Sequence, residues 1–385
     1  MEEEKMSDVS YSRGLAGVIA DESKICTIDG EKGELYYSGY PIQTLAREST
    51  YPETVYLLLY GKLPNQTQLN ELISKLKDNS KVPAYALQML QQCPKDAHPM
   101  RILQLLTAAL GMHENQDSSW NMTEKREAAI KLIAAYPTIV AAASRHRRGL
   151  PILEPRSDLD HSANFLYMLQ GEVPNEKIVR MFDICLILHA EHTFNASTFT
   201  GRVVGSTLSD LHSAVAAAVG ALYGPLHGGA NERVLHMVDE IGSIDNLNSW
   251  FETAMAEKKK VMGMGHRVYK TIDPRAKILG SMLEELASEK KDTSNLEILK
   301  ALQAKMAAKM EASGKEIWPN VDFFSGTLYT LMGIEPIDYT PIFALSRVAG
   351  WTAHILELWN DNRLYRPKAY YVGEKDLEYT PISSR

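Results

Sequence analysis

The stretch GPLHGGAN places a histidine, His227, between a Gly-Pro pair and two glycines. The Gly-Pro pair cannot continue the helix before it, and residues 230–241 have the pattern of a new helix that begins at Gly228 and Gly229. His227 would there face unpaired N–H groups and the positive end of a helix dipole, which disfavour an imidazolium. We predict a neutral imidazole that donates a hydrogen bond. The alternative is a histidine that only ends a loop.

A second histidine, His266, follows two glycines in GMGHRVYKTIDPRAK. The glycines let the backbone approach a ligand closely. The stretch is not a dinucleotide fingerprint, because the third glycine is missing and no buried strand precedes it. Arg275 lies in the first turn of a predicted helix, where the dipole favours acids. A cation at that position suggests an anionic partner, although arginines also occur at ordinary helix starts.

An aspartate, Asp322, lies among apolar and aromatic residues in WPNVDFFSG. It is either a helix N-cap or a carboxylate with a raised pKa that can act as a base. The stretch alone favours the cap.

The predicted helix after Pro174 carries a stripe that ends in two histidines. The stripe consists of Ile178, Phe182, Cys185, His189 and His192, with spacings that place them on one helical face. Such a face leaves a core and enters a polar pocket. Two satisfied core histidines, or a cap at the helix end, remain open alternatives. Zinc is the least favoured, because HAEH is not HExxH and no third ligand is placed by spacing.

Helical periodicity dominates the chain, so we predict an all-α protein. Prolines at first turns mark several helix starts, at Pro52, Pro174 and Pro274, and glycines mark ends at Gly61 and Gly149. Only KICTIDGEKGELYYSGY predicts strands, with a Gly-containing turn between them. The chain becomes lysine-rich between residues 252 and 315, which indicates a smaller subdomain with a solvated face.

The bulk composition bounds the function. The chain has 385 residues, with 41 Lys+Arg against 48 Asp+Glu and a net charge of −7, so no overall positive field favours nucleic acid or an anionic membrane. Its three cysteines are far apart and favour a reducing compartment over a disulfide framework. The acidic start MEEEK lacks the apolar core of a signal peptide. We expect no stretch of about 20 residues apolar enough to span a bilayer. The longest candidate, residues 211–226, predicts a buried helix, and we expect a cytoplasmic protein without membrane or nucleic-acid partners.

The motifs together resemble one family, the citrate synthases. The resemblance rests on HAEHTFNAST, GPLHGGAN, GHRVYKTIDPR, PNVDFFSG and LSRVAGW, in this order and spacing. It extends from GLAGVIADESKICTIDG near the N-terminus to RLYRPKAYYVG near the C-terminus, nearly the whole chain. Met264 departs from the alanine, phenylalanine or tyrosine expected between the glycines, which puts no catalytic group in doubt.

The resemblance implies a citrate synthase-like all-α homodimer with a small N-terminal β-hairpin. Each subunit would have a large domain of residues 1–227 and 327–385 and a small domain of residues 228–326. The active site would lie in the cleft between them. Acetyl-CoA would condense with oxaloacetate to citryl-CoA, which is hydrolysed to citrate and CoA in the tricarboxylic acid cycle. No metal or other cofactor is implied, because the CoA thioester is a co-substrate.

The resemblance also implies roles for particular residues. A thioester methyl is a weak carbon acid that needs a base and a hydrogen-bond donor at its oxygen. Asp322 matches the family's base, His227 the neutral donor, and His266 the residue that polarises the ketone of oxaloacetate. The matching substrate-binding residues are His192, Arg275, Arg347 and Arg366, the last from the other subunit. The candidates for CoA binding are the backbone of Val261, Met262, Gly263, Met264 and Gly265, with Lys270, Lys315 and Arg145 for phosphate.

Two further functions stay open at this stage. A 2-methylcitrate synthase would use the same residues with propionyl-CoA, and one methylene discriminates by only about 1–3 kcal/mol. A non-catalytic helical dimer is the other, and it predicts loss of a catalytic residue, whereas His227, His266 and Asp322 are all present.

Overall fold

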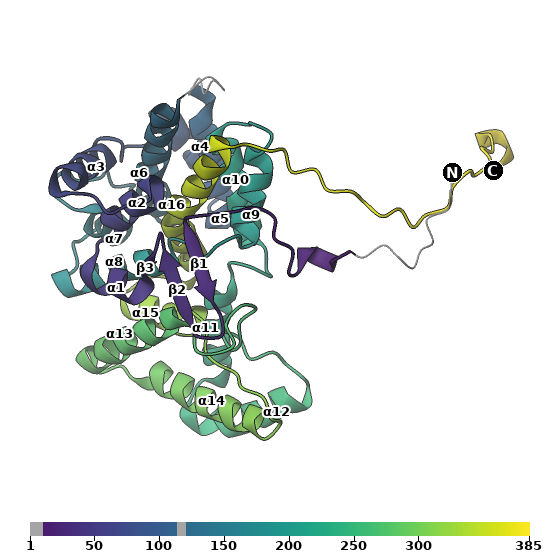
Figure 1. The fold of residues 1–385 in the computed structure, drawn as a ribbon. Coiled ribbons are helices and arrows are strands. Elements are labelled where there is room, and N and C mark those ends of the chain that lie inside the picture. The colour runs from purple at the N-terminus through teal and green to yellow at the C-terminus, as the bar shows by residue number, and fades with distance from the viewer. Residues whose placement is uncertain (1–10, 114–120) are drawn as a thin grey trace.

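A computed structural model describes residues 11–113 and 121–385, so the acidic stretch MEEEK lies outside the described residues. These residues form sixteen α-helices and one small sheet. Figure 1 shows their arrangement. The prediction of an all-α protein is therefore confirmed. Short 3-10 turns lie at Arg13–Leu15, Gly111–His113, Ile244–Asn246, Pro336–Asp338 and Ile382–Ser384.

The predicted hairpin is present, and a third short strand extends it. Strands β1 (Cys26–Asp29), β2 (Glu34–Tyr37) and β3 (Tyr40–Pro41) are antiparallel, in the order β1-β2-β3. Tyr37 ends β2 fully buried, and its hydroxyl donates to the Glu191 carbonyl at 2.8 Å. The sheet is thereby tied to the segment that carries His192.

The helices before GPLHGGAN form most of the upper body in Figure 1. They are α1 (Ile42–Glu48), α2 (Tyr51–Tyr60), α3 (Gln66–Asp78), α4 (Ala84–Gln92), α5 (Pro99–Leu110), α6 (Met122–Arg147), α7 (His161–Gln170), α8 (Glu176–His189), α9 (Ala196–Gly205) and α10 (Leu211–Tyr223). Pro52 lies in the first turn of α2, and Gly61 ends that helix with a φ of 70°, as predicted. The predicted buried helix at residues 211–226 is α10, which ends at Tyr223.

Helix α6 corrects the expectation that no stretch is long and apolar enough to span a bilayer. An 18-residue window in Met122–Arg147 reaches a mean hydropathy of 1.2, and 89% of that window is buried inside the protein. Other helices already cover its apolar surface, which is typical of a core helix. Length and composition alone are weak evidence for a membrane span.

A second group of helices lies below this body in Figure 1. It comprises α11 (Ala230–Ile241), α12 (Leu247–Ala256), α13 (Pro274–Lys290), α14 (Ser294–Glu311) and α15 (Asp322–Leu331). Both α11 and α13 pack against α15. The predicted boundary of the small domain at Gly326 falls inside α15.

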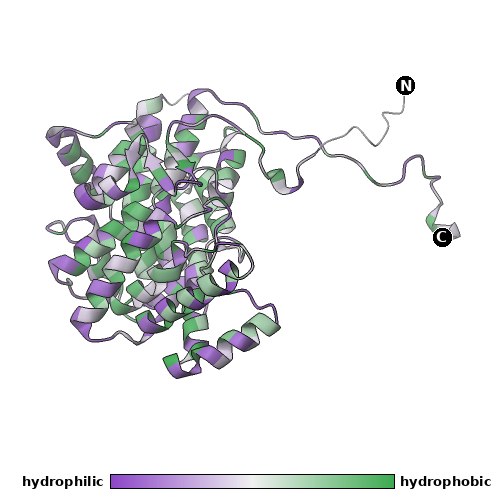
Figure 2. Ribbon diagram, turned by 60° about the horizontal axis from the view of Figure 1, so that its bottom comes forward, coloured by the Kyte–Doolittle hydropathy of each residue, from purple (hydrophilic) through white to green (hydrophobic). Residues whose placement is uncertain are grey.

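The long helix α16 (Tyr339–Asn360) returns to the upper body and is buried along nearly its whole length. It packs against α2, α6, α8, α9 and α10. Figure 2 shows apolar residues gathered on the helices of the body, while the two terminal segments extend away from it. From residue 366 to residue 385 every residue is exposed.

Candidate active site

His227 lies in the loop between α10 and α11, half-buried, with its ring against the start of α9. Its Nε2 accepts the backbone N–H of Ser197 at 3.2 Å and lies 2.8 Å from the Ser197 hydroxyl. Because Nε2 accepts, the proton of the neutral ring is on Nδ1. Burial, and next the charge of Arg347, lower the pKa of His227 to about 4.

The neutral imidazole agrees with the prediction, and α11 begins at Ala230 with Gly229 as its N-cap, as predicted. The N–H partner assigned to His227 is wrong. Ser197 is the second residue of α9, so the N–H group that meets His227 belongs to α9 and not to α11. The partner lies thirty residues earlier in the chain, and spacing along one motif does not reveal it.

His266 occupies a turn whose backbone requires the two glycines that precede it. Gly263 and Gly265 have φ values of 75° and 82°, a region that favours glycine. The Nδ1 of His266 accepts the N–H of Val268 at 3.0 Å and that of Tyr269 at 3.2 Å. The proton of the neutral ring is therefore on Nε2. Burial, and next the charge of Arg275, lower the pKa of His266 to about 4.

The loop of His266 is joined to the loop that precedes Asp322. The N–H of Gly265 donates to the Trp318 carbonyl at 2.8 Å. Asn320 donates its backbone N–H to the Gly263 carbonyl and its side-chain amide to the Gly265 carbonyl, both at 2.9 Å. These bonds fix His266 and Asp322 on adjoining parts of one small structure.

Asp322 is the first residue of α15, and the N-cap interpretation is wrong. The cap residue is Val321, whose side chain makes no cap hydrogen bond, and the N–H of Asp322 donates to Oδ1 of Asn320 at 3.0 Å. Burial raises the pKa of the Asp322 carboxyl to about 6, although the charge of Arg275 lowers it. The carboxyl is still mostly ionised at pH 7 and is a stronger base than an ordinary aspartate.

His192 is buried next to His266, but it does not lie on the helical stripe predicted for it. Helix α8 ends at His189, so His192 belongs to the segment that follows. Its ring centroid is 5.4 Å from that of His266, and its Nε2 lies 3.3 Å from the hydroxyl of Tyr269. Burial, followed by the charge of Arg275, holds the pKa of His192 well below its usual value.

Tyr269 is a site residue that the sequence did not single out. Its N–H meets His266, its hydroxyl meets His192, and its ring lies 4.7 Å from the His266 ring. The only signal was its place three residues after His266 in GHRVYK.

Arg275 is buried in the first turn of α13, and the reason inferred for it needs correction. Its Nε and Nη2 donate to the two oxygens of Asp273 at 3.0 and 2.7 Å. Asp273 is also the N-cap of α13. The helix therefore supplies a carboxylate for this cation, and its position alone does not require an external anion.

Arg347 of α16 is the second buried cation. Its Nε donates to the His189 carbonyl at 2.7 Å, and the guanidinium lies 4.7 Å above the ring of Phe343. Burial lowers the pKa of Arg347, and the carboxylate of Glu191 opposes that effect. Arg275 and Arg347 both act on the pKa of His192. The two positive charges thus favour a neutral ring at His192.

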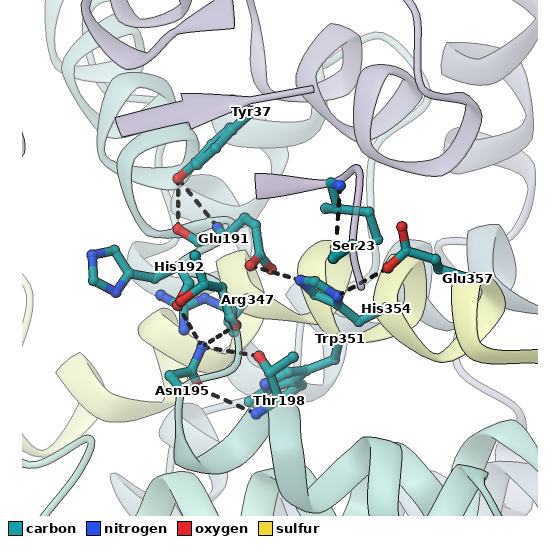
Figure 3. Close-up of polar contacts among 12 residues, drawn as sticks. Ser23, Tyr37, Glu191, His192, Asn195, Thr198, Arg347, Trp351, His354 and Glu357 are labelled. Atoms are coloured by element: carbon teal, nitrogen blue, oxygen red, sulfur yellow. Dashed lines mark hydrogen bonds and ion pairs between the residues drawn. The ribbon is translucent and has the colours of Figure 1, made fainter. Parts of the chain in front are cut away.

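Near Arg347 lies a chain of ionisable groups that the sequence did not predict. It consists of Glu191, His354 and Glu357 (Figure 3). The Glu191 carboxylate is 2.8 Å from Nε2 of His354, and Nδ1 of His354 is 3.7 Å from Glu357. Burial disfavours the His354 cation, but Glu191 outweighs it and the pKa of His354 is raised. A Cβ at Gly350 would lie 2.2 Å from a Glu191 oxygen, so only glycine fits there.

A cavity of about 400 Å³ opens beside His266. Its lining includes Gly265, Tyr269 and two predicted phosphate ligands, Lys270 and Lys315. Lys270 also forms an ion pair with Glu31 of the hairpin turn. The other backbone candidates, Val261, Met262, Gly263 and Met264, lead into the His266 turn, where Met264 is buried and bridges to Pro319.

Two predicted residues lie away from this cluster. Arg145 of α6 is buried, and its guanidinium donates to the carbonyls of Pro151 at 2.5 Å and Leu169 at 3.3 Å. It does not line the cavity beside His266, so this geometry gives no support for a contact with CoA. Arg366 is exposed on the C-terminal segment.

Comparisons with known proteins agree over almost the whole chain. Residues 14–368 match the family model described as citrate synthase, C-terminal domain. A citrate synthase of Deinococcus radiodurans is 43% identical over 98% of this chain and 99% of its own. A 2-methylcitrate synthase of Mycobacterium tuberculosis is 41% identical over 94% of this chain and 91% of its own. The Thermoplasma acidophilum citrate synthase, solved with carboxymethyl coenzyme A and oxaloacetate, superimposes with a TM-score of 0.93 at 35% identity, covering 98% of this chain and 100% of that one.

Proposed function

This chain belongs to the citrate synthase family, and we propose that it condenses acetyl-CoA with oxaloacetate and hydrolyses citryl-CoA to citrate and CoA. This reaction brings acetyl-CoA into the tricarboxylic acid cycle. The observation that carries the proposal is the set of hydrogen bonds that orients two half-buried histidines. Ser197 donates to Nε2 of His227, and Val268 and Tyr269 donate to Nδ1 of His266. Burial also raises the pKa of Asp322 to about 6, which suits a base.

Enolisation of the thioester is the first step, and it uses Asp322 and His227. The Asp322 carboxylate removes a proton from the methyl group of acetyl-CoA. The Nδ1–H of His227 donates to the thioester oxygen as negative charge develops there. The bond from Ser197 to Nε2 fixes this tautomer. A neutral donor avoids the cost of burying an imidazolium beside Arg347.

Condensation is the second step, and it uses His266. The enol carbon attacks the ketone carbon of oxaloacetate, and the Nε2–H of His266 donates to the ketone oxygen. The two backbone bonds to Nδ1 leave Nε2 as the donor. As the alkoxide forms it takes this proton, and the proton that Asp322 removed from the methyl group returns to the site and restores neutral His266. The product is citryl-CoA, which water then hydrolyses.

Oxaloacetate carries two carboxylates, and buried cations suit such a ligand. We assign them to Arg275 and Arg347, with His192 as a further hydrogen-bonding group. Arg366 would come from a second copy of the chain in a homodimer. Its exposure on a segment that leaves the subunit supports this assignment.

For CoA we assign the cavity beside His266, with Lys270 and Lys315 for phosphate and the backbone of residues 261–265 for the adenine. Residues 228–326 would form a small domain that closes over the substrates and excludes water before enolisation. The assigned steps use side chains and the CoA thioester alone. Three free cysteines support a reducing compartment, and we place the protein in the cytoplasm.

The test is release of free thiol from acetyl-CoA by the purified protein, with and without oxaloacetate. Oxaloacetate-dependent release that disappears in Asp322→Asn is expected. Oxaloacetate-dependent release that Asp322→Asn retains at the normal rate would refute the assigned base. Metal analysis of the same preparation addresses the zinc alternative, for which stoichiometric metal and loss of activity with chelator would be required.

The relative that uses propionyl-CoA makes 2-methylcitrate synthesis the second candidate. The ratio of kcat/KM for acetyl-CoA and propionyl-CoA separates the two. We expect a preference for acetyl-CoA, and a clear preference for propionyl-CoA would establish the second candidate.

A further inference from the structure

Tyr365, the residue before Arg366, is fixed to the body by several contacts. Its N–H donates to the Ser206 hydroxyl at 3.1 Å. Its own hydroxyl donates to Asp21 at 2.8 Å and accepts from Nε of Arg202 at 3.0 Å. Its ring stacks on Phe199 with centroids 5.7 Å apart. Both the backbone and the side chain of Tyr365 are therefore held.

Arg202 at the centre of these contacts is itself immobilised. It is 1% exposed, lies 4.4 Å above the ring of Phe194, and forms an ion pair with Asp21. Its Nη1 donates to the His354 carbonyl at 2.9 Å. A buried, fully engaged guanidinium of this kind differs from a surface ion pair, which contributes little to order. We call Asp21, Arg202 and Tyr365 the tail anchor.

The tail anchor is the last firm attachment before the exposed C-terminal segment. Every residue from 366 to 385 is exposed, and Arg366 itself has one long contact, 3.5 Å, to the carbonyl of Pro367. Consecutive Cα atoms are about 3.8 Å apart. Fixing Tyr365 therefore fixes the point and the direction in which Arg366 leaves the subunit.

We propose that the tail anchor positions Arg366 for the oxaloacetate site of a second copy of the chain. The inference rests on the proposed function, in which Arg366 completes the partner's site. Without the anchor, Arg366 would have to be ordered when oxaloacetate binds, and that ordering weakens affinity. The residues of the tail anchor are positioning residues, because they act only through Arg366.

The test uses hybrid dimers in which one subunit carries Asp322→Asn. Two different affinity tags on co-expressed chains allow such dimers to be purified. Only the other subunit then has a working site, and its arginine comes from the Asp322→Asn subunit. Tyr365→Phe removes the hydroxyl that joins Asp21 and Arg202 but keeps the aromatic ring.

The expected KM depends on which subunit of the hybrid dimer carries Tyr365→Phe. On the Asp322→Asn subunit it should raise KM for oxaloacetate about tenfold, the effect of one lost hydrogen bond to charged groups, with kcat little changed. On the subunit with the working site it should leave KM unchanged. A structural defect within one subunit would give the opposite pattern, and that result would overturn the proposal.

Two controls separate failure of the anchor from failure of the proposed function. Arg366→Ala in the same two positions tests the shared site itself: no effect from the Asp322→Asn subunit would refute Arg366 as a ligand of the partner's substrate. If Arg366→Ala acts across the dimer and Tyr365→Phe does not, only the anchor is refuted. Tyr370→Phe, in the same exposed segment, should leave KM unchanged in both positions. An equal effect from Tyr370→Phe would contradict a specific anchor.

Discussion

Two groups of residues at the candidate site differ in how their charge is compensated. The first group, His227, His266 and Asp322, is half-buried and has no ion pair within the described residues, and desolvation shifts each pKa toward the neutral form. In the second group, Arg275 pairs with Asp273, and Glu191 pairs with His354. Groups that exchange protons near pH 7 need the first environment. Groups that must stay ionised to hold a dianion need the second.

The largest effect should come from removing the base in the first group. Asp322→Asn keeps the shape of the side chain but cannot accept a proton, so kcat should fall about 10³-fold or more. Oxaloacetate should still bind, because the second group of residues is unchanged. Steady-state thiol release gives kcat, and calorimetric titration gives oxaloacetate affinity. If affinity and kcat fell together by similar factors, the two groups of residues would not have separate roles in binding and catalysis.

The next effect is a change in folding stability that comes from the second group. Glu191→Gln leaves His354 and Arg347 without their buried carboxylate, and we expect a loss of about 3 kcal/mol in the free energy of unfolding. A raised pKa for His354 contributes stability below about pH 6.5 that disappears as pH rises through the folded-state pKa. Denaturant unfolding should therefore show the largest difference from wild type near pH 6 and a smaller one at pH 9. A constant difference across that range would argue against a charged His354.

A stability change of the opposite sign, at most as large, should accompany loss of the base. A carboxyl whose pKa is raised from 3.8 to about 6 destabilises the folded protein once it ionises. Asp322→Asn should then raise the free energy of unfolding at pH 7 by up to about 3 kcal/mol. The gain should shrink as the pH falls and vanish below about pH 3, where the carboxyl is protonated in the unfolded chain as well as in the folded protein. Destabilisation at pH 7 would mean that the ionised carboxylate is favourably paired.

The smallest effect should come from Tyr269, which contacts both His192 and His266. Tyr269→Phe removes the hydroxyl that meets His192 but keeps the backbone N–H that fixes His266. KM for oxaloacetate should rise by about five- to tenfold, with kcat within about twofold of wild type. Tyr36→Phe, which removes a hydroxyl bonded to Glu34 in the sheet, is the matched control. A fall in kcat without a change in KM would place Tyr269 in the chemistry itself.

Local patterns in the sequence were enough to predict the helix starts at Pro52 and Pro274, the hairpin and the motifs that carry His227, His266 and Asp322. Pro174 lies outside its helix, because α8 begins at Glu176. The errors arose where a partner lies outside the motif. Ser197, thirty residues before His227, supplies the N–H that spacing had assigned to α11. Glu191 and His354 are 163 residues apart. Periodicity describes one face of one helix, so it cannot reveal which distant group will share that face after folding.

The bonds of Asn320 to both glycines of the His266 turn have a mechanical consequence. Any rotation of the lower helices against the upper body would carry His266 and Asp322 together, while His227 stays with Ser197 at the start of α9. An open cleft would therefore keep its base beside the group that activates the ketone, yet separate that base from the donor for the enol. If the small domain closes as proposed, only the closed molecule would have the base and the enol donor together, and closure would then set when the proton is removed.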